Sequence, residues 1–246
     1  MRSCIFIDSE NLRYSIIDLF PYPLFNKDDY FPKIAKWEDL FNKIAKDANT
    51  DRLRTYWYVV NEIEFYPFNL KRFIRDGKFT DLKKILNENY EDRIKKSLKL
   101  DDEMKSIVTE LDNKRSSVES QFKGWKVLQD GIASTHEAVE FRRTGRIRYD
   151  LFKNRFVPYS EKSVDVKLAT DLLYLKDIYD VAIILSGDQD YVPAVERIKD
   201  SGKKAINVYF EKADGTLLPG GAPRLNQICD SAIRLTYDEM KKYMAL

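Results

Sequence analysis

Short apolar runs that lack polar alternation constrain the fold of this chain more than any other feature. The clearest runs cover residues 4–7, 55–60 and 181–185, and weaker ones cover 126–128, 205–210 and 232–235. Strands buried on both faces of a parallel sheet have this pattern, whereas a half-exposed strand alternates apolar and polar residues. The sequence therefore predicts a central, mostly parallel sheet.

Stretches of helical length separate these runs. In residues 34–48 the apolar side chains recur every three or four positions, and residues 165–179 and 191–200 repeat that spacing. Strands that alternate with helices are typical of a doubly wound α/β domain. We therefore predict an α/β fold in which helices flank the sheet.

Residues 65–122 depart from this alternation. From Leu82 to Leu111 apolar residues recur at helical spacing, with Lys, Glu and Asp on the other face. We predict a helical insertion, a hairpin broken near residues 99–102. It is either a packing lid on the sheet or an element that recognises a substrate or partner, and its mixed surface could support a homodimer.

The composition excludes several classes of protein. Cys4 and Cys229 are the only cysteines, too few for a disulfide framework or a cysteine-rich zinc site. His136 is the only histidine, which rules out multi-histidine metal sites. No apolar run approaches the ~18 residues of a membrane helix, and the run before Asp8 is too short for a secretory signal. We expect a cytoplasmic protein without a membrane partner, and its net charge of +2 leaves nucleic-acid binding to a local basic groove.

Acidic residues follow the predicted strands. Asp8 ends the first run, Asp188 and Asp190 follow residues 181–185, and Asp165 begins the helix that leads into that strand. In open α/β sheets the carboxyl ends of the strands form the ligand site, at the point where strand order reverses. Four carboxylates gathered there would repel one another, and a hard divalent cation such as Mg²⁺ or Mn²⁺ would relieve that repulsion. The pattern favours a site for one or two ions.

Three ordered segments resemble motifs of NYN domains, the branch of PIN-like nucleases that includes the LabA-like proteins. They are Phe6–Leu12, Lys162–Asp171 and Ile184–Tyr191. Residues 225–235 are similar to the family's final helix and strand, while Tyr191 stands where phenylalanine is frequent. The resemblance implies an NYN (PIN-like) nuclease domain with a Rossmann-like fold, formed by residues 1–64 and 123–246, with 65–122 inserted.

The resemblance also implies an activity, that of a Mg²⁺- or Mn²⁺-dependent endoribonuclease. The residues that match the family's acidic positions, and that are implied both to bind the metal and to act in catalysis, are Asp8, Asp165, Asp188 and Asp190. Hydrolysis of an RNA phosphodiester by a metal-activated water should leave a 5′-phosphate and a 3′-hydroxyl.

Four further residues are implied to support this site. Asn11 matches the amide after the first acid, and Ser186 matches a small polar residue before the third motif. Lys162 is a candidate contact to the scissile phosphate. Asp171 matches a recurrent acid, but it lies six residues beyond Asp165 and so on another helical face, which favours a supporting or ion-pairing role.

Residues 141–149 are the candidate RNA-binding segment. They combine two aromatic residues and a turn at Gly145 with four arginines, Arg142, Arg143, Arg146 and Arg148. Arginine forks suit phosphates, and aromatic rings can stack on unpaired bases of single-stranded RNA or of a structured RNA such as tRNA. The position of the segment in the chain predicts that it projects over the acidic edge. The alternative is a solvated hairpin whose arginines pair with Glu137, Glu140 and Asp150.

Two other functions remain compatible with these residues. A non-catalytic RNA-binding or regulatory module would bind RNA in EDTA without cleaving it. A metal-dependent phosphohydrolase would act on small phosphate esters and not on polymers, although such a substrate needs no extended basic track.

Overall fold

The structure is a computed structural model that describes residues 1–21, 23–25, 31–32, 34–157, 160–218 and 223–245. It contains two compact units. The first consists of residues 1–61, 127–144 and 163–246, and the second of residues 62–126 and 145–162. In these described residues no helix is long and apolar enough to cross a membrane.

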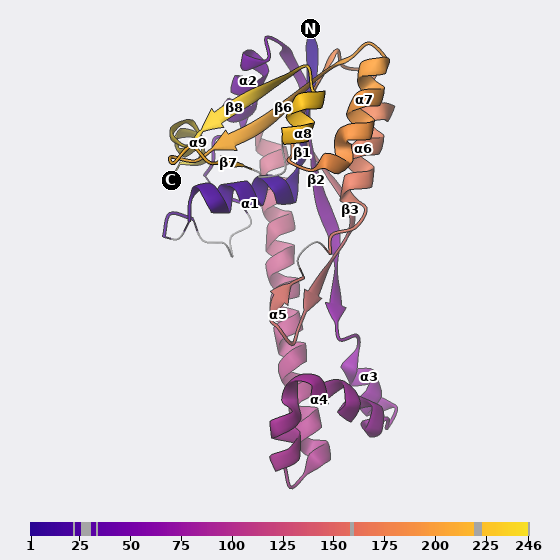
Figure 1. The fold of residues 1–246 in the computed structure, drawn as a ribbon. Coiled ribbons are helices and arrows are strands. Elements are labelled where there is room, and N and C mark those ends of the chain that lie inside the picture. Colours follow the sequence, from indigo (N-terminus) through magenta and orange to yellow (C-terminus); the bar gives the residue numbers. More distant parts are fainter. Residues whose placement is uncertain (22, 26–30, 33, 158–159, 219–222, 246) are drawn as a thin grey trace. The chain divides into compact units, whose positions relative to one another are not determined.

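The first unit is built on a mostly parallel sheet, which confirms the predicted α/β class (Figure 1). The strand order is β3-β2-β1-β5-β6-β7, and β8 also pairs with β6. Neighbours from β2 through β1, β5 and β6 to β8 are parallel, and β7 is antiparallel to β6. The strands are β1 (Arg2–Asp8), β2 (Asp51–Tyr66), β3 (Val139–Asp150), β5 (Val181–Leu185), β6 (Lys204–Glu211), β7 (Leu217–Leu218) and β8 (Ser231–Thr236).

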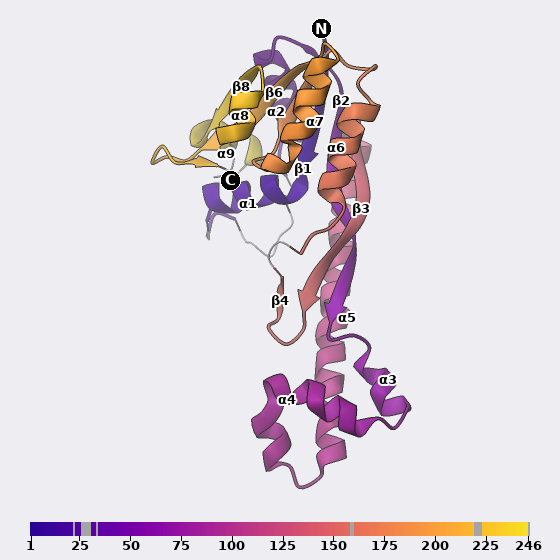
Figure 2. The same cartoon turned by 45° about the vertical axis from the view of Figure 1, so that its right-hand side comes forward.

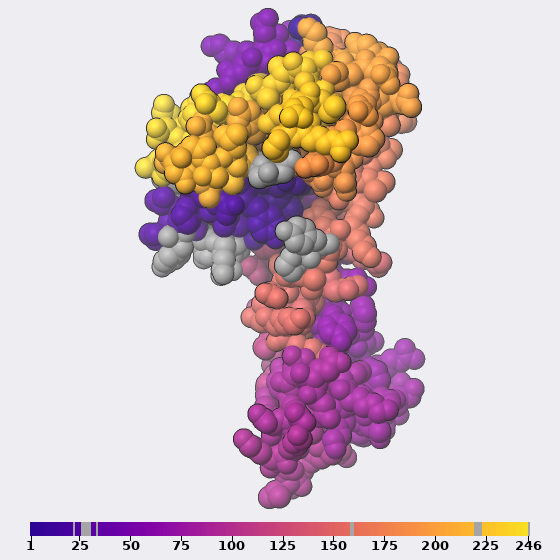
Figure 3. Space-filling model, in the orientation of Figure 1, coloured from indigo at the N-terminus to yellow at the C-terminus, as the bar shows by residue number. Residues whose placement is uncertain are grey.

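Helices flank this sheet. Figures 1 and 2 show α6, α7 and α8 in front of the sheet and α2 behind it. Figure 3 shows orange and yellow side chains over the upper part of the viewed face of the first unit, above a band of indigo ones. The helices are α1 (Ser9–Leu19), α2 (Trp37–Asp47), α6 (Val164–Tyr174), α7 (Val192–Asp200), α8 (Pro223–Ile228) and α9 (Tyr237–Met244), with a 3₁₀ turn η1 (Gln189–Tyr191).

Strand order reverses at β1. Its residue Ile7 lies beside Trp57 of β2 and beside Leu185 of β5, both in parallel register. All five residues of β5 are buried, as its uninterrupted apolar run predicts. The predicted adjacency of the first strand and residues 181–185 is therefore confirmed, and the residues that follow both strands emerge at one edge.

The strand predicted at residues 126–128 is wrong, because those residues lie inside α5 (Leu100–Thr135). The buried side chains Val118, Phe122, Trp125 and Ile132 recur at helical spacing, whereas Val127 is 70% exposed. The short apolar run is therefore the edge of a longer helical stripe.

The second unit is mainly helical, as predicted for residues 65–122. It contains α3 (Leu70–Arg75), α4 (Phe79–Lys96), the first part of α5 and the short strand β4 (Arg155–Phe156), which pairs with β3. The helix break lies between Lys96 and Leu100, slightly before the predicted position. Most of the predicted stripe is buried in a core that includes Leu82, Leu86, Ile107 and Leu111, whereas Leu98, between the two helices, is fully exposed. The boundaries 1–64, 65–122 and 123–246 remain predictions, since this compact unit also takes in residues 145–162.

Candidate functional site

Asp8 lies at the carboxyl end of β1 and also caps α1. Its side chain is 2% exposed, and its Oδ1 accepts a 3.2 Å hydrogen bond from the backbone N–H of Asn11. The turn from strand to helix thus holds this carboxylate inside the sheet edge, where few waters can solvate it. Burying a charged group in such a position costs free energy unless hydrogen-bond donors surround it.

Three side-chain donors converge on the other oxygen of Asp8. Its Oδ2 accepts hydrogen bonds from Asn11 Nδ2 at 2.5 Å, Ser186 Oγ at 3.0 Å and Tyr191 Oη at 3.2 Å. Burial raises the pKa of Asp8 to about 6, the Asn11 N–H opposes that rise, and the negative charge of Asp165 adds to it. Asp8 is therefore an anion at neutral pH, and its surroundings make protonation easier than for an ordinary aspartate.

The loop after β5 contributes the next two acids. The backbone N–H of Asp188 donates to Ser186 Oγ at 3.0 Å, and Asp188 in turn accepts a 2.9 Å bond from the N–H of Asp190. Asn11 ties this loop to β1, because its Oδ1 accepts a 3.3 Å bond from the N–H of Gly187. Asp188 is half-buried and Asp190 is exposed.

Asp165 completes the acidic group from the first turn of α6. It is half-buried, and its Oδ1 accepts a 3.2 Å hydrogen bond from Tyr191 Oη. Burial raises the pKa of Asp165, the Tyr191 hydroxyl lowers it, and the charges of Asp188 and Asp190 raise it further. The carboxylates predicted to share one strand edge are thus close enough to influence one another's ionisation.

Tyr191 is the residue whose role the sequence reasoning missed. Its side chain is fully buried, and its hydroxyl contacts both Asp8 and Asp165. The signal lay in the departure from phenylalanine at this position, which adds one hydroxyl to a buried ring beside two acids. A buried tyrosine hydroxyl normally requires a partner, and this one has two carboxylates.

The acidic side chains do not form a ready-made metal cage. Among the described residues, no group of three or more His, Cys, Asp or Glu side chains is arranged so that it could hold a metal ion. Protein donors occupy the oxygens of Asp8 instead. The chemistry of the donor set still suits a hard divalent cation, because its oxygen ligands are carboxylates. The raised pKa values of Asp8 and Asp165 reflect both burial and the repulsion of neighbouring acids.

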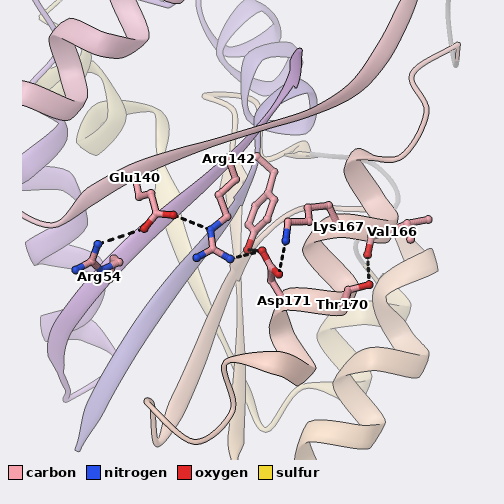
Figure 4. A network of polar contacts seen from close by, with 8 residues as sticks. Arg54, Glu140, Arg142, Val166, Lys167, Thr170 and Asp171 are labelled. Carbon is pink, nitrogen blue, oxygen red and sulfur yellow. Dashed lines mark hydrogen bonds and ion pairs between the residues drawn. The ribbon is translucent and has the colours of Figure 1, made fainter. Parts of the chain in front are cut away.

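Asp171 belongs to a separate, buried ion-pair network (Figure 4). Its carboxylate pairs with Lys167 Nζ at 2.9 Å and with Arg142, and it accepts a 3.0 Å hydrogen bond from Tyr58 Oη. Burial would raise the pKa of Asp171, but the hydrogen bonds from Lys167 and Arg142 lower it overall. Since Tyr58 and Arg142 lie on β2 and β3, the network fastens α6 to the sheet.

The arginine segment is a strand rather than a turn. Residues 139–150 form β3, although Gly145 has the positive φ of 64° that favours glycine. The turn predicted within residues 141–149 is therefore wrong, because β3 continues through the glycine.

Each of the four arginines contacts an acidic side chain. Arg142 pairs with Glu140 at 3.0 Å, as the solvated-hairpin alternative expected, and its guanidinium also lies 4.1 Å from the centre of the Tyr56 ring. Arg143 pairs with Asp130 at 2.6 Å.

The other basic candidates belong to the second unit. Arg146 and Arg148 approach Glu64 at 3.9 and 3.5 Å and keep side-chain exposures of 55% and 45%. Lys162 is exposed, and its backbone pairs with that of Arg146. Arg142 and Arg143 thus lie in the first unit and Arg146 and Arg148 in the second, and the placement of the segment over the acidic edge stays a prediction.

The comparisons with known proteins add a partial family match. The NYN domain model matches residues 120–234, slightly less than half of the chain. That span includes Asp165, Ser186, Asp188 and Asp190, whereas Asp8 and Asn11 precede it. No curated protein matches the chain.

Three solved structures are similar to the chain at low identity. A protein of unknown function from Vibrio parahaemolyticus is 14% identical with a TM-score of 0.43, over 95% of this chain and 92% of that one. The 5′-exonuclease of bacteriophage T5 with bound zinc is 12% identical with a TM-score of 0.36, over 78% of this chain and 52% of that one. A flap endonuclease of bacteriophage T5, in a complex with DNA and metal ions, is 11% identical with a TM-score of 0.38, over 88% and 57%. The chain thus spans slightly more than half the length of each phage enzyme.

Proposed function

We propose that the protein is a metal-dependent endoribonuclease that hydrolyses RNA phosphodiester bonds at the acidic edge of β1, β5 and α6. The observation that carries the proposal is the shared hydroxyl of Tyr191, which contacts Asp8 and Asp165 at 3.2 Å each although they come from different elements. The NYN match over residues 120–234 supports a nuclease-type function. Raised pKa values at neighbouring acids are characteristic of functional sites.

Asp8, Asp165, Asp188 and Asp190 are the residues that would hold Mg²⁺ or Mn²⁺. When bound, such an ion lowers the pKa of a coordinated water and offsets the negative charge that develops on the phosphate. Carboxylate oxygens are its preferred ligands, and the repulsion between Asp8 and Asp165 is the electrostatic cost that it would remove.

The surrounding residues orient these acids. Asn11 and Ser186 hold the buried carboxylate of Asp8 by donating to its Oδ2. Ser186 also accepts the N–H of Asp188, so a single hydroxyl connects the two acids. Such fixed partners keep the carboxylates in place before the substrate arrives, which is the preorganisation that phosphoryl chemistry requires.

End-labelled single-stranded RNA and a tRNA pool, incubated with purified protein in Mn²⁺, Mg²⁺ or EDTA, test the proposal. We expect cleavage that requires the metal and leaves 5′-phosphate ends, and we expect Asp188→Asn to abolish it. Asp200→Asn is the matched control, because Asp200 is an exposed acid on α7 outside the site. Metal-dependent cleavage that persists in Asp188→Asn contradicts the proposal.

A second candidate is a non-catalytic RNA-binding module. The hydrogen bonds that already occupy both oxygens of Asp8 favour it, since they satisfy the buried charge without a cation. This candidate predicts RNA retention in EDTA and no product in any metal. The proposed RNA contacts in either case are Arg142, Arg143, Arg146, Arg148 and Lys162. Light scattering of the purified chain checks the predicted homodimer.

A further inference from the structure

The second unit contains a hollow that the acidic site does not use. Its volume is about 390 Å³, within the range of small-ligand pockets, and apolar and aromatic side chains form much of its wall. Its lining comes from the end of β2, the β2–α3 connection with Phe68, α3 with Arg72, the α3–α4 connection with Asp76 and Lys78, and α4.

Phe68 is the most exposed aromatic ring of this hollow. Its exposed fraction is 56%, compared with 37% for Tyr66. Phe68 and Asn69 also line a second hollow of about 390 Å³, in which Arg115 and Arg146 take part. One accessible ring therefore borders two adjoining hollows. This arrangement suits a polymer that carries flat aromatic groups along its chain.

The lining of the first hollow carries a small positive surplus. Its Arg72 pairs with Asp76 at 3.3 Å, and Asp76 also pairs at 3.1 Å with Arg75, which lies outside the lining; the two arginine side chains are 67% and 75% exposed. Lys78 adds a further positive charge to the lining. The charge balance of this lining thus favours an anionic ligand.

The second hollow is more nearly neutral. Glu62 and Glu64 line it together with Arg115 and Arg146, and Glu64 lies within 4 Å of Arg146. The first hollow, with Arg72 and Lys78, is therefore the more positive of the two, and phosphate groups would bind there.

We propose that these hollows form a docking site for single-stranded RNA, in which an unpaired base stacks on Phe68 and flanking phosphates contact Arg72 and Lys78. Exposed aromatic rings beside arginines are the features by which proteins bind single strands without reading their sequence. The proposal rests on the RNA substrate of the proposed function, and it adds a binding site in the helical unit that is separate from the acidic residues.

Fluorescence anisotropy with a labelled 12-nucleotide single strand, in EDTA so that no metal-dependent cleavage occurs, tests the site on the full chain. We expect Phe68→Ala to weaken binding about fivefold or more, because one stacked base is lost, while Phe68→Trp retains it. Arg72→Gln should weaken binding and reduce the slope of log Kd against log salt by about 0.7, the value for one lost phosphate contact on a single strand.

Matched controls come from the first unit. Tyr174→Ala removes an aromatic ring that is 80% exposed, and Arg197→Gln removes an arginine that is 74% exposed and pairs with Asp200 in its own helix, as Arg72 pairs with Asp76. Both controls should bind the strand within twofold of the unmodified protein.

The outcomes separate this site from the proposed function. If Phe68→Ala and Arg72→Gln bind as tightly as the controls, the docking site is wrong even where the protein cleaves RNA. Weakened binding in both variants supports the site even if no metal yields cleavage. A protein that binds no single strand, or that binds an acidic peptide through Phe68 more tightly than the RNA, overturns the proposal in favour of no ligand or a protein ligand.

Discussion

The hydroxyl of Ser186 donates a 3.0 Å hydrogen bond to Oδ2 of Asp8 and joins the ends of β5 and β1. The same oxygen of Ser186 accepts the backbone N–H of Asp188 at 3.0 Å. One buried side chain thus connects two strands with the loop that carries two of the acids. A neutral side chain, that of Ser186, therefore helps to stabilise the buried charge of Asp8 and to position Asp188.

Replacing Ser186 with alanine should destabilise the fold and impair the site together. The substitution removes one donor from Asp8 and leaves the N–H of Asp188 without its acceptor, so we expect a loss of about 1–3 kcal/mol in the free energy of unfolding. Urea denaturation measures it. Ser201→Ala, at the end of α7, serves as the control and should change stability by about 0.5 kcal/mol or less. Equal stability of the two variants would show that the Ser186 contacts contribute nothing.

The stability of the protein should depend on pH through Asp8. Its pKa is raised from the ordinary value of 3.8 to about 6 on folding, so between these values the folded protein binds more protons than the unfolded one. The contribution of Asp8 to stability therefore falls as pH rises from about 4 to about 6, by about 3 kcal/mol in all. Thermal melts in EDTA across this range check it, since Asp8→Asn should lack this component of the slope. A difference between the two proteins that stays constant with pH contradicts the prediction.

The activity should have the opposite dependence. If cleavage requires the ionised carboxylate of Asp8, its rate declines as pH drops below about 6, where Asp8 takes up a proton. Initial rates at saturating Mn²⁺ measure this acid limb. Bound metal would shift the limb to lower pH, and a rate that increases on acidification would be inconsistent with the role of Asp8.

Removal of the Tyr191 hydroxyl should tighten metal binding. Its proton contacts oxygens of Asp8 and Asp165 that a cation would also need, so Tyr191→Phe frees those oxygens and increases the repulsion between the two acids. We expect a several-fold lower half-saturating Mn²⁺ concentration for cleavage and a folded protein, because the ring stays buried. Calorimetric titration of Mn²⁺ supplies a readout that does not depend on turnover. Weaker Mn²⁺ binding in this variant would instead make the hydroxyl a positioning group that the site needs.

Replacing Arg142 should lower the stability of the protein, because its guanidinium pairs with the buried carboxylate of Asp171. Arg142→Gln leaves the buried carboxylate of Asp171 with Lys167 and Tyr58 alone, and we expect a loss of about 3 kcal/mol. Arg197→Gln is the matched control, because Arg197 is exposed and pairs with the exposed Asp200, so its loss should cost less than about 1 kcal/mol. Denaturation of both variants decides between the two roles of Arg142. Reduced RNA binding by Arg142→Gln without loss of stability would contradict the structural role and support the predicted contact of Arg142 with RNA.

Part of the candidate site could be read directly from the chain. Asp8 follows an uninterrupted apolar run, and Asp188 follows another, and such runs form the buried central strands that end at one edge of a parallel sheet. The spacing of Asp165 and Asp171 likewise indicated different helical faces, and Asp171 does lie in a separate ion-pair network.

Other features depended on contacts between distant parts of the chain. The sequence pattern did not indicate that α5 continues to Thr135, because residues 126–128 by themselves fit a strand as well as a helix. It also predicted a turn at Gly145, where pairing extends β3 through the glycine.

The order of residues along the chain is enough to predict most of the buried segments and their periodicity, and hence the α/β class and the acids that follow the central strands. The partners of the buried polar side chains depend on the packed fold, since Tyr191 contacts Asp8 across 183 positions and Arg142 contacts Asp171 across 29. The physical reason is that burial and helical or strand period are local properties of a sequence, whereas the choice of hydrogen-bond and ion-pair partners requires the packed arrangement of strands and helices.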